Sequence, residues 1–220
     1  MTDVNHEISV QVAVIEFVAS CRPGVNLRLV SGARFRYYEL PPVHALCWGT
    51  HMNLFLLRHG IAADSDPARF PDDSLRPLTG PGEQRVREIA TAMHQLDLRI
   101  DLIWCSPYLR TRQTAAETAK ILETEDRLEP HDQLSPNGDP GKLLARLSVL
   151  KPAPSNVLLV GHEPYLSNLL SVVASGGSNL QAELKKGGLA KLETTGPLGL
   201  HQCAVLQWLL PPRLLVKIVR

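Results

Sequence analysis

The chain has 220 residues, of which 44% are hydrophobic and 20% are charged, and its formal net charge at pH 7 is +1. This length suits one good-sized domain and is marginal for two. The near-neutral charge argues against a broad binding surface for nucleic acid or anionic membranes, so any affinity for anions must be local.

The cysteines and the apolar runs indicate which cellular compartment, membrane segments and cofactors to expect. Four cysteines are scattered along the chain, with no CxxC pair and no metal-ligand spacing. This usage favours the reducing cytoplasm over a disulfide framework. No apolar run approaches the roughly 18 residues of a membrane span. We therefore expect a cytoplasmic protein that has no membrane segment and uses no metal or other cofactor.

The first 51 residues differ from the rest of the chain. Their charges balance, Pro41-Pro42 breaks any regular element, and Met52 stands directly before the first strand of a complete-looking domain. We expect residues 1–51 to be an N-terminal extension, either poorly ordered or the product of a start assigned too early, and residues 52–220 to form one domain. A functional extension is the alternative. In that case a chain that starts at Met52 would lose activity or solubility.

From Met52 onward, apolar runs and capping residues predict strands and helices in alternation. Buried strands are expected at residues 53–57, 102–105 and 156–160. Thr79, Ser106 and Asp139 are N-cap residues, and each is followed closely by a proline. The helices are expected at residues 80–96, 107–122, 140–150 and 164–174, and two further strands at residues 189–193 and 203–210. This order predicts an α/β fold, a three-layer α/β/α sandwich with a mostly parallel central sheet and a mixed C-terminal edge.

Residues suited to phosphate follow each of the three buried strands. Arg58-His59 closes the first, Arg110 lies just past the second, and His162 follows the third. Because the carboxyl ends of parallel strands meet at one edge of a sheet, the fold is expected to bring these residues together, although they are about fifty positions apart.

These residue types fit phosphoryl transfer. Catalysis of that reaction is mostly positioning plus cationic stabilisation of the equatorial oxygens. Arg58 and Arg110 each offer a planar, bidentate fork. The amides of the helix expected to begin at Pro107 point the same way. A histidine that is neutral at physiological pH can act as the covalent nucleophile.

The motifs resemble those of the histidine phosphatase (phosphoglycerate mutase-like) superfamily: LRHG at residues 57–60, SPYLRTRQT at residues 106–114 and GH at residues 161–162. Within it, the chain is similar to the SixA-type phosphohistidine phosphatases, through LT at residues 78–79, LSPNGD at 134–139, GHEP at 161–164 and KGGLA at 186–190. The resemblance covers Met52 to about Leu215. It implies a phosphatase in which His59 is phosphorylated during turnover and Arg58, Arg110 and His162 complete the phosphate pocket. Because the sequence shows no metal cluster, we expect the activity to be metal-independent.

The chain departs from the superfamily pattern at residues 134–138. Mutases and many phosphomonoesterases carry a glutamate there, as the acid for the leaving oxygen, and here no carboxylate matches. Glu129, Asp132 and Asp139 lie nearby but outside the motif. A missing acid harms an alkyl ester, whose leaving alkoxide is very basic, more than it harms a phosphohistidine, whose imidazole leaves neutral. The stretch between the second and third motifs is also short, which predicts an open pocket that suits a phosphohistidine on another protein.

The leading hypothesis is therefore a phosphohistidine phosphatase, active as a monomer on a phosphohistidine-bearing protein and not on nucleic acid. A small-molecule phosphomonoesterase on the same fold is the first alternative. A non-catalytic phosphate-binding module is the second, and the four intact pocket residues argue against it.

Other polar residues are expected to have structural roles. His94, His131 and His201 have no supporting motif and are expected at the surface. Glu163 is either a carboxylate in the first turn of a helix or a pocket residue that assists protonation, and the structural role is favoured. Lys185-Lys186 indicates a solvated turn.

Overall fold

The structure is a computed structural model, and it describes residues 51–219. The predicted N-terminal extension falls on residues 1–50 and so lies outside the described residues. The described strands are β1 (Asn53–Arg58), β2 (Leu102–Cys105), β3 (Leu128–Pro130), β4 (Asn156–Gly161), β5 (Leu189–Thr194) and β6 (Ala204–Leu210). The α-helices are α2 (Gly80–Gln95), α3 (Leu109–Ile121), α4 (Pro140–Ser148), α5 (Tyr165–Ser175) and α6 (Pro212–Val219).

The strands form a six-stranded sheet in the order β3-β2-β4-β1-β5-β6. β1 runs parallel to β4, β4 to β2, and β2 to β3, whereas β5 and β6 are antiparallel additions beside β1. This confirms the mostly parallel sheet with a mixed C-terminal edge. In such a sheet the carboxyl ends of β1, β4 and β2 lie next to one another.

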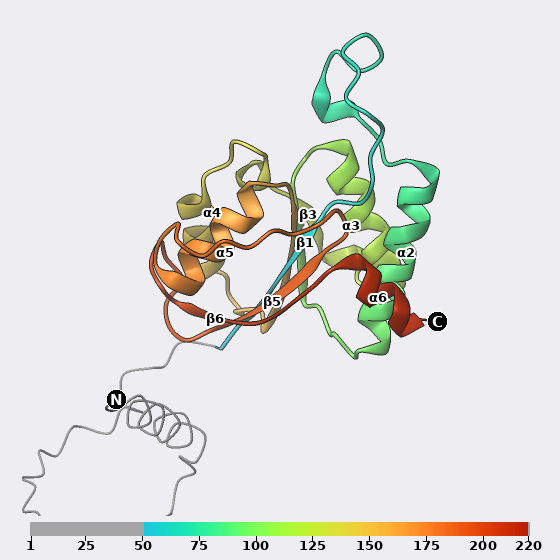
Figure 1. Ribbon diagram of the computed structural model, residues 1–220. Coiled ribbons are helices and arrows are strands. Elements are labelled where there is room, and N and C mark those ends of the chain that lie inside the picture. Colours follow the sequence, from blue (N-terminus) through green and yellow to red (C-terminus); the bar gives the residue numbers. More distant parts are fainter. Residues whose placement is uncertain (1–50, 220) are drawn as a thin grey trace, which may run out of the picture. The chain divides into compact units, whose positions relative to one another are not determined.

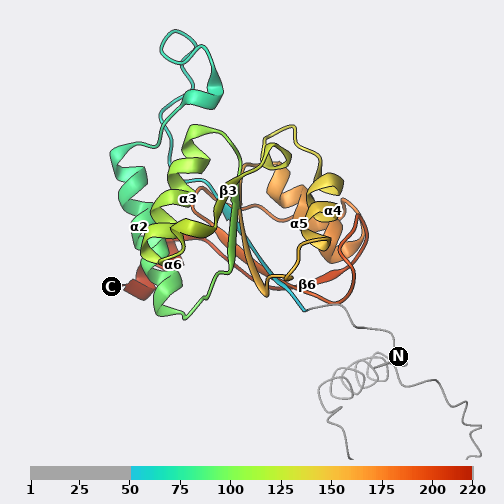
Figure 2. The same ribbon diagram turned by 180° about the vertical axis from the view of Figure 1, so that it is seen from behind.

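Helices cover both faces of the sheet, as Figures 1 and 2 show. Leu54 and Leu56 of β1 belong to a core cluster that includes side chains of α4 and α5. Phe55 and Leu57, which point the other way, belong to a second cluster with side chains of α2, α3 and α6. The alternation follows from the two-residue period of a strand, and burying such a side chain contributes roughly 1.5–3 kcal/mol. The predicted three-layer α/β/α sandwich is confirmed.

Two of the helices begin at their predicted caps. The Oγ1 of Thr79 accepts a hydrogen bond from the amide of Gly82 at 3.0 Å, at the start of α2. A carboxylate oxygen of Asp139 accepts from the amides of Gly141 and Lys142 at 2.9 and 3.1 Å, at the start of α4. Each cap satisfies amides that have no partner within the helix.

The predicted start of α3 is wrong. This helix begins at Leu109 with Tyr108 as its N-cap, so Pro107 lies outside it and Ser106 is not its cap. The Oγ of Ser106 does accept a hydrogen bond from the amide of Tyr108, at 3.3 Å, but it also faces His162 across the sheet edge. The structure also contains β3 and α6, which the sequence pattern did not predict.

Candidate active site

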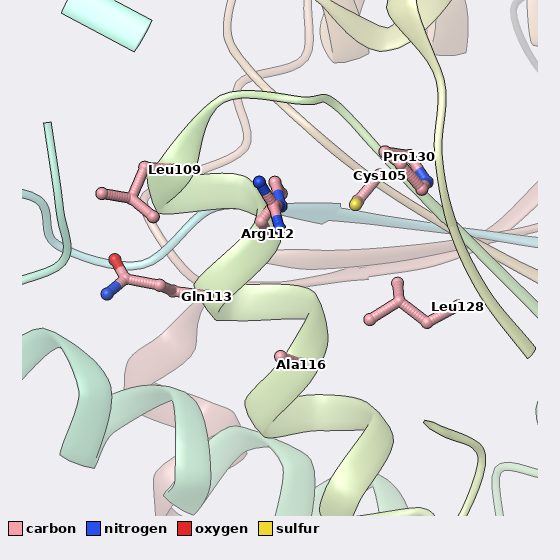
Figure 3. A pocket seen from close by; sticks show the side chains of 7 residues that line it. All are labelled: Cys105, Leu109, Arg112, Gln113, Ala116, Leu128 and Pro130. Carbon is pink, nitrogen blue, oxygen red and sulfur yellow. The ribbon is translucent and has the colours of Figure 1, made fainter. Parts of the chain in front are cut away.

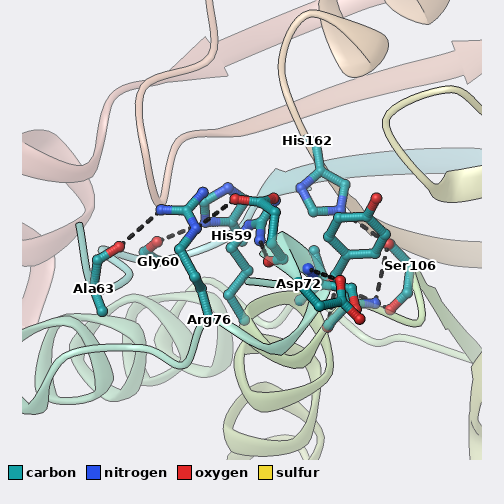
Figure 4. Close-up of polar contacts among 12 residues, drawn as sticks. His59, Gly60, Ala63, Asp72, Arg76, Ser106 and His162 are labelled. Carbon is teal, nitrogen blue, oxygen red and sulfur yellow. Dashed lines mark hydrogen bonds and ion pairs between the residues drawn. The ribbon is translucent and has the colours of Figure 1, made fainter. Parts of the chain in front are cut away.

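Backbone hydrogen bonds join the ends of the three central strands. Arg58, the last residue of β1, pairs with Gly161, the last residue of β4. The amide of His59 donates to the carbonyl of Gly161 at 3.1 Å, and the amide of Ser106 donates to the carbonyl of Val160 at 3.0 Å. The residues that follow the three strands are therefore held side by side, and Figure 4 shows His59, Ser106 and His162 at this edge.

The His59 ring is held in a defined orientation. Its side chain is 7% exposed, and its Nδ1 lies 2.7 Å from the carbonyl oxygen of Gly60. Because a carbonyl only accepts, this contact assigns the proton to Nδ1 and leaves the lone pair of Nε2 available. A β-carbon on Gly60 would lie 2.6 Å from Cγ2 of Val86, so α2 can pack close only against a glycine. Fixed in this way, Nε2 can attack an electrophile without reorientation.

His162 faces His59 from the end of β4. It is 2% exposed, and the two ring centroids are 5.2 Å apart. Its Nε2 lies 2.9 Å from Oγ of Ser106, which already accepts the amide of Tyr108. The ring and the hydroxyl share one hydrogen bond, and the tautomer of His162 sets which of the two donates. Within residues 51–219, Nδ1 is buried and has no hydrogen-bond partner.

Arg110 lies in the first turn of α3 and is 4% exposed. Its two terminal nitrogens are both bound by Asp73: Nη1 donates to the backbone carbonyl at 2.8 Å and Nη2 to the carboxylate at 2.9 Å. Its Nε is buried and makes no hydrogen bond to any described residue. Asp73 thus holds one side of the guanidinium and leaves the Nε side for another acceptor.

In Arg58, as in Arg110, one part of the guanidinium is bound to the protein and the Nε has no partner. Its Nη1 donates to the carbonyl of Leu184 at 2.8 Å, while its Nε is buried and unpartnered among the described residues. The amide of Gly187 also contacts the carbonyls of Arg58 and His59, at 3.1 and 3.2 Å. Gly187 has a φ of 79°, which a residue with a side chain rarely adopts. The turn before β5 is therefore part of the site.

The structure thus brings Arg58, His59, Arg110 and His162 to one sheet edge and adds residues whose part in the site was not predicted. Arg76 binds the carboxylate of Asp73 through Nε at 2.6 Å. Its Nη1 binds the carbonyl of Ala63 at 2.8 Å, as Figure 4 shows. The further residues at this edge are Asp73, Arg76, Ser106, Tyr108 and Leu184. Ser106 and Tyr108 stand within the motif at residues 106–114, which was the sequence signal for them. Asp73 and Leu184 lie outside the motifs and make contacts that span 37 and 126 positions, so no local pattern indicated them.

The second arginine of α3 has a different environment. Arg112 is exposed and lines a cavity of about 360 Å³ beside Cys105 (Figure 3). The other lining residues are Leu109, Gln113, Ala116, Leu128 and Pro130. Burial raises the pKa of the Cys105 thiol to about 11, so this thiol stays protonated at neutral pH.

Both histidines are neutral at physiological pH. Burial lowers the pKa of His59 to about 4; the hydrogen bond to Gly60 opposes this shift, and the charges of Arg110 and Arg58 add to it. Burial lowers the pKa of His162 to about 3, and His59 and Arg110 contribute to the shift. Burial and the charges of the nearby arginines both disfavour protonation of the two histidines. The Nε2 of His59 is therefore unprotonated when the protein works at neutral pH.

This pKa shift predicts a pH-dependent stability. The unfolded chain protonates His59 at about 6.5 and the folded chain only near 4. The unfolded state therefore binds more protons in this window. The contribution is fully present above pH 6.5 and is lost as the pH falls toward 4. Between pH 7 and pH 5, His59 is expected to lower the free energy of unfolding by about 2 kcal/mol.

Urea titrations at pH 7 and pH 5 measure this effect, and the His59→Ala variant is the matched control. Its loss of stability between the two pH values should be smaller than that of the unchanged protein by about 2 kcal/mol. Equal losses in both proteins would show that His59 titrates near its ordinary pKa.

One expectation about the other histidines is wrong. His94 and His201 are exposed, but His131 is 6% exposed and its ring lies 3.9 Å from the ring of Trp104. Its Nε2 lies 3.2 Å from the carboxylate of Glu129. His131 follows β3, and since β3 was not predicted, the burial of His131 against β2 was missed as well.

Neither a metal cluster nor a membrane-spanning helix is found in the described part of the chain. Among residues 51–219, no group of three or more His, Cys, Asp or Glu side chains is placed to hold a metal ion. No helix in the same range combines the length and the apolar character needed to cross a bilayer.

The chain is similar in sequence to known proteins. A family model described as Histidine phosphatase superfamily (branch 1) matches residues 54–135. An uncharacterised protein of the cyanobacterium Picosynechococcus sp. is 40% identical over 148 residues, which are 65% of this chain and 86% of that protein. The phosphohistidine phosphatase SixA of Escherichia coli K12 is 33% identical over 126 residues, which are 57% of this chain and 76% of SixA.

The fold is also similar to solved structures. A structure of the protein histidine phosphatase SixA complexed with tungstate superposes with a TM-score of 0.64 at 28% sequence identity. The match covers 74% of this chain and 99% of that one. The similarity therefore spans the whole of the smaller protein.

Proposed function

The chain belongs to the histidine phosphatase superfamily as a homologue of SixA, and we propose that it removes phosphate from protein phosphohistidine through a phosphoryl group carried on His59. Membership makes it a phosphatase of the histidine type. We propose the substrate and the role of each site residue.

Unpartnered donors at the site carry this proposal. The Nε atoms of Arg58 and Arg110 and the Nδ1 of His162 are buried, and none has a hydrogen-bond partner among the described residues. A buried donor without a partner costs about 1–3 kcal/mol, so the two arginine Nε donors call for an acceptor. A phosphoryl group supplies several acceptor oxygens at once, and the Nε2 of His59 is free to bond to its phosphorus. In the similar SixA structure the bound oxyanion is tungstate, which is tetrahedral as phosphate is.

In the first proposed step, the lone pair of Nε2 of His59 attacks phosphorus while the bond from phosphorus to the substrate imidazole breaks. The electron pair of that bond goes to the substrate nitrogen. When the other nitrogen of the substrate ring carries a proton, the leaving group is a neutral imidazole. His59 then holds the phosphoryl group on Nε2 and a proton on Nδ1, and the carbonyl of Gly60 accepts from that proton at the 2.7 Å contact.

In the second step, water attacks the phosphorus of phospho-His59. The bond to Nε2 breaks, its electron pair returns to Nε2, and both protons of the water remain on the inorganic phosphate, which is released as H₂PO₄⁻. The guanidinium groups of Arg58 and Arg110 stabilise the charge on the equatorial oxygens in both steps. Neither step needs a metal ion.

The carboxylates near the site favour a substrate with a good leaving group. Glu129 is paired with His131, and Asp139 caps α4. Partial burial of Asp73 raises its pKa, but the hydrogen bonds and charges of Arg76 and Arg110 outweigh this and hold the pKa below its usual value. Asp73 is therefore ionised at neutral pH and has no proton to donate to an alkoxide. A phosphohistidine has the least need of one.

Rates on matched substrates test the proposal. A protein whose histidine has been phosphorylated with phosphoramidate should be hydrolysed with a kcat/KM at least about 100-fold higher than that of an alkyl phosphate such as phosphoserine, because a general acid typically contributes about 10²–10⁴-fold. EDTA should leave the rate unchanged.

Each other outcome identifies a different function. Faster hydrolysis of the alkyl ester would make the protein a small-molecule phosphomonoesterase. Tight binding of orthophosphate without turnover of either substrate would make it a phosphate-binding module. Loss of the rate in EDTA, restored by added metal, would contradict the metal-free steps.

A further inference from the structure

Glu163, the residue after His162, accepts hydrogen bonds from the protein at both of its carboxylate oxygens. One carboxylate oxygen accepts from the amide of Leu184 at 3.1 Å, and the other accepts from the hydroxyl of Ser167 at 2.5 Å. Ser167 lies one turn further on, in α5. The contact with Leu184 is different, because it reaches 21 positions along the chain into a segment that touches the phosphate pocket.

Leu184 begins a short segment that runs along the end of β1. Its carbonyl accepts from Nη1 of Arg58 at 2.8 Å, and its side chain is fully buried. Further on, the carbonyl of Gly188 accepts from the amide of Arg58 at 3.1 Å. The peptide units on both sides of Leu184 thus connect two site residues: its amide is held by Glu163, and its carbonyl holds the guanidinium of Arg58.

The segment depends on these contacts for its position. Residues 176–188, between α5 and β5, contain neither helix nor strand. Their backbone groups therefore lack the repeated hydrogen bonds that hold a sheet or a helix in place. The position of the segment depends more strongly on each of the hydrogen bonds that it does make. A hydrogen bond to an ionised acceptor is stronger than one between neutral groups.

We propose that Glu163 is a positioning residue that fixes the guanidinium of Arg58 for phosphate through the peptide of Leu184. The inference rests on the proposed phosphate pocket and adds to it the device that orients one of its two arginines. The role assigned to Glu163 is structural, because each of its carboxylate oxygens accepts a hydrogen bond from the protein. Removal of Glu163 is expected to weaken anion binding first, because the Nε of Arg58 is a pocket donor that has no partner among the described residues.

Calorimetric titration with orthophosphate measures that consequence without any assumption about the physiological substrate. The Glu163→Ala variant should bind orthophosphate roughly tenfold more weakly than the unchanged protein, the effect of losing one charge-assisted hydrogen bond. Glu163→Gln should stay within about threefold, because its amide oxygen still accepts from Leu184 and its amide nitrogen can donate to Ser167. Glu125→Ala is the matched control: Glu125 is exposed in the short 3-10 helix that precedes β3, away from the carboxyl ends of the strands, and its removal should leave the affinity unchanged.

A double-mutant cycle with Arg58→Ala shows whether Glu163 acts through Arg58. If it does, Glu163→Ala should cause no further loss of orthophosphate affinity once Arg58 has been removed. Additive losses would overturn the proposal. An effect of Glu163→Gln as large as that of Glu163→Ala would also overturn it, because it would show that the charge of Glu163 matters for affinity and its hydrogen bond to Leu184 does not. Normal affinity in Glu163→Ala overturns this inference alone. A failure of the unchanged protein to bind orthophosphate overturns the proposed function with it.

Discussion

The His59→Ala variant is expected to lose turnover, with kcat lower by roughly 10⁴-fold or more, because removing the group that forms the covalent intermediate removes the chemical pathway itself. The alanine has no nitrogen to accept the phosphoryl group, while Arg58, Arg110 and His162 remain in place to bind it. The variant should therefore still bind orthophosphate. Rapid quenching of the unchanged protein with a radiolabelled phosphohistidine substrate should show an acid-labile label on the chain, and the variant should show none.

The matched control for this experiment is His94→Ala. His94 is exposed near the end of α2 and takes no part in the site, so its removal should change neither the label nor the rate. Thermal unfolding of both variants shows whether the fold has survived. Turnover by a folded His59→Ala variant at more than a few per cent of the normal rate would refute His59 as the nucleophile.

Arg110→Ala is expected to produce the second-largest loss, with kcat/KM lower by roughly 10³-fold. The reason is the geometry of its donors. Asp73 holds Nη1 and Nη2, so the Nε side of a buried guanidinium is left for the phosphoryl oxygens. Removing the side chain takes away both the charge and the directed donor, and it releases Asp73, an anion that repels phosphate, from one of its partners.

Arg110→Lys separates the two contributions, because lysine keeps the charge but cannot bind Asp73 and phosphate in a planar fork. This variant should recover only part of the lost kcat/KM. Arg112→Ala is the matched control, since Arg112 lies on the same helix, is exposed at the separate cavity of Figure 3 and should have little effect. Full activity of Arg110→Lys would show that charge alone is required at this position.

The sequence predicted the elements that local patterns determine. The runs that became β1, β2 and β4 are continuous and apolar, as strands buried on both faces must be, and Thr79 and Asp139 cap helices through residues only two or three positions away. The elements it missed lack such signals. β3 has only three residues, one of them a proline, and it gains its structure from pairing with β2. α6 starts directly after the antiparallel edge of the sheet, and its stability comes from packing against α2.

The assignment of Ser106 shows how local reasoning fails at a functional site. Serine followed by proline is a common start for a helix, and the prediction followed from that preference. In the structure the helix begins two residues after Pro107, and the Ser106 hydroxyl is directed to His162, 56 positions away. The hydroxyl keeps a local hydrogen bond from the amide of Tyr108 and adds a hydrogen bond across the sheet edge.

For this protein, the sequence alone determined the fold class and the four residues, Arg58, His59, Arg110 and His162, that meet at one edge of the sheet. It could do so because strand ends and motif order are properties of neighbouring residues. Only the tertiary structure decided which atoms of those residues remain free, that Asp73 holds Arg110, and that Glu163 reaches Arg58 through Leu184. These contacts join irregular segments that are distant in the chain, and the packed layers bring them within hydrogen-bonding distance.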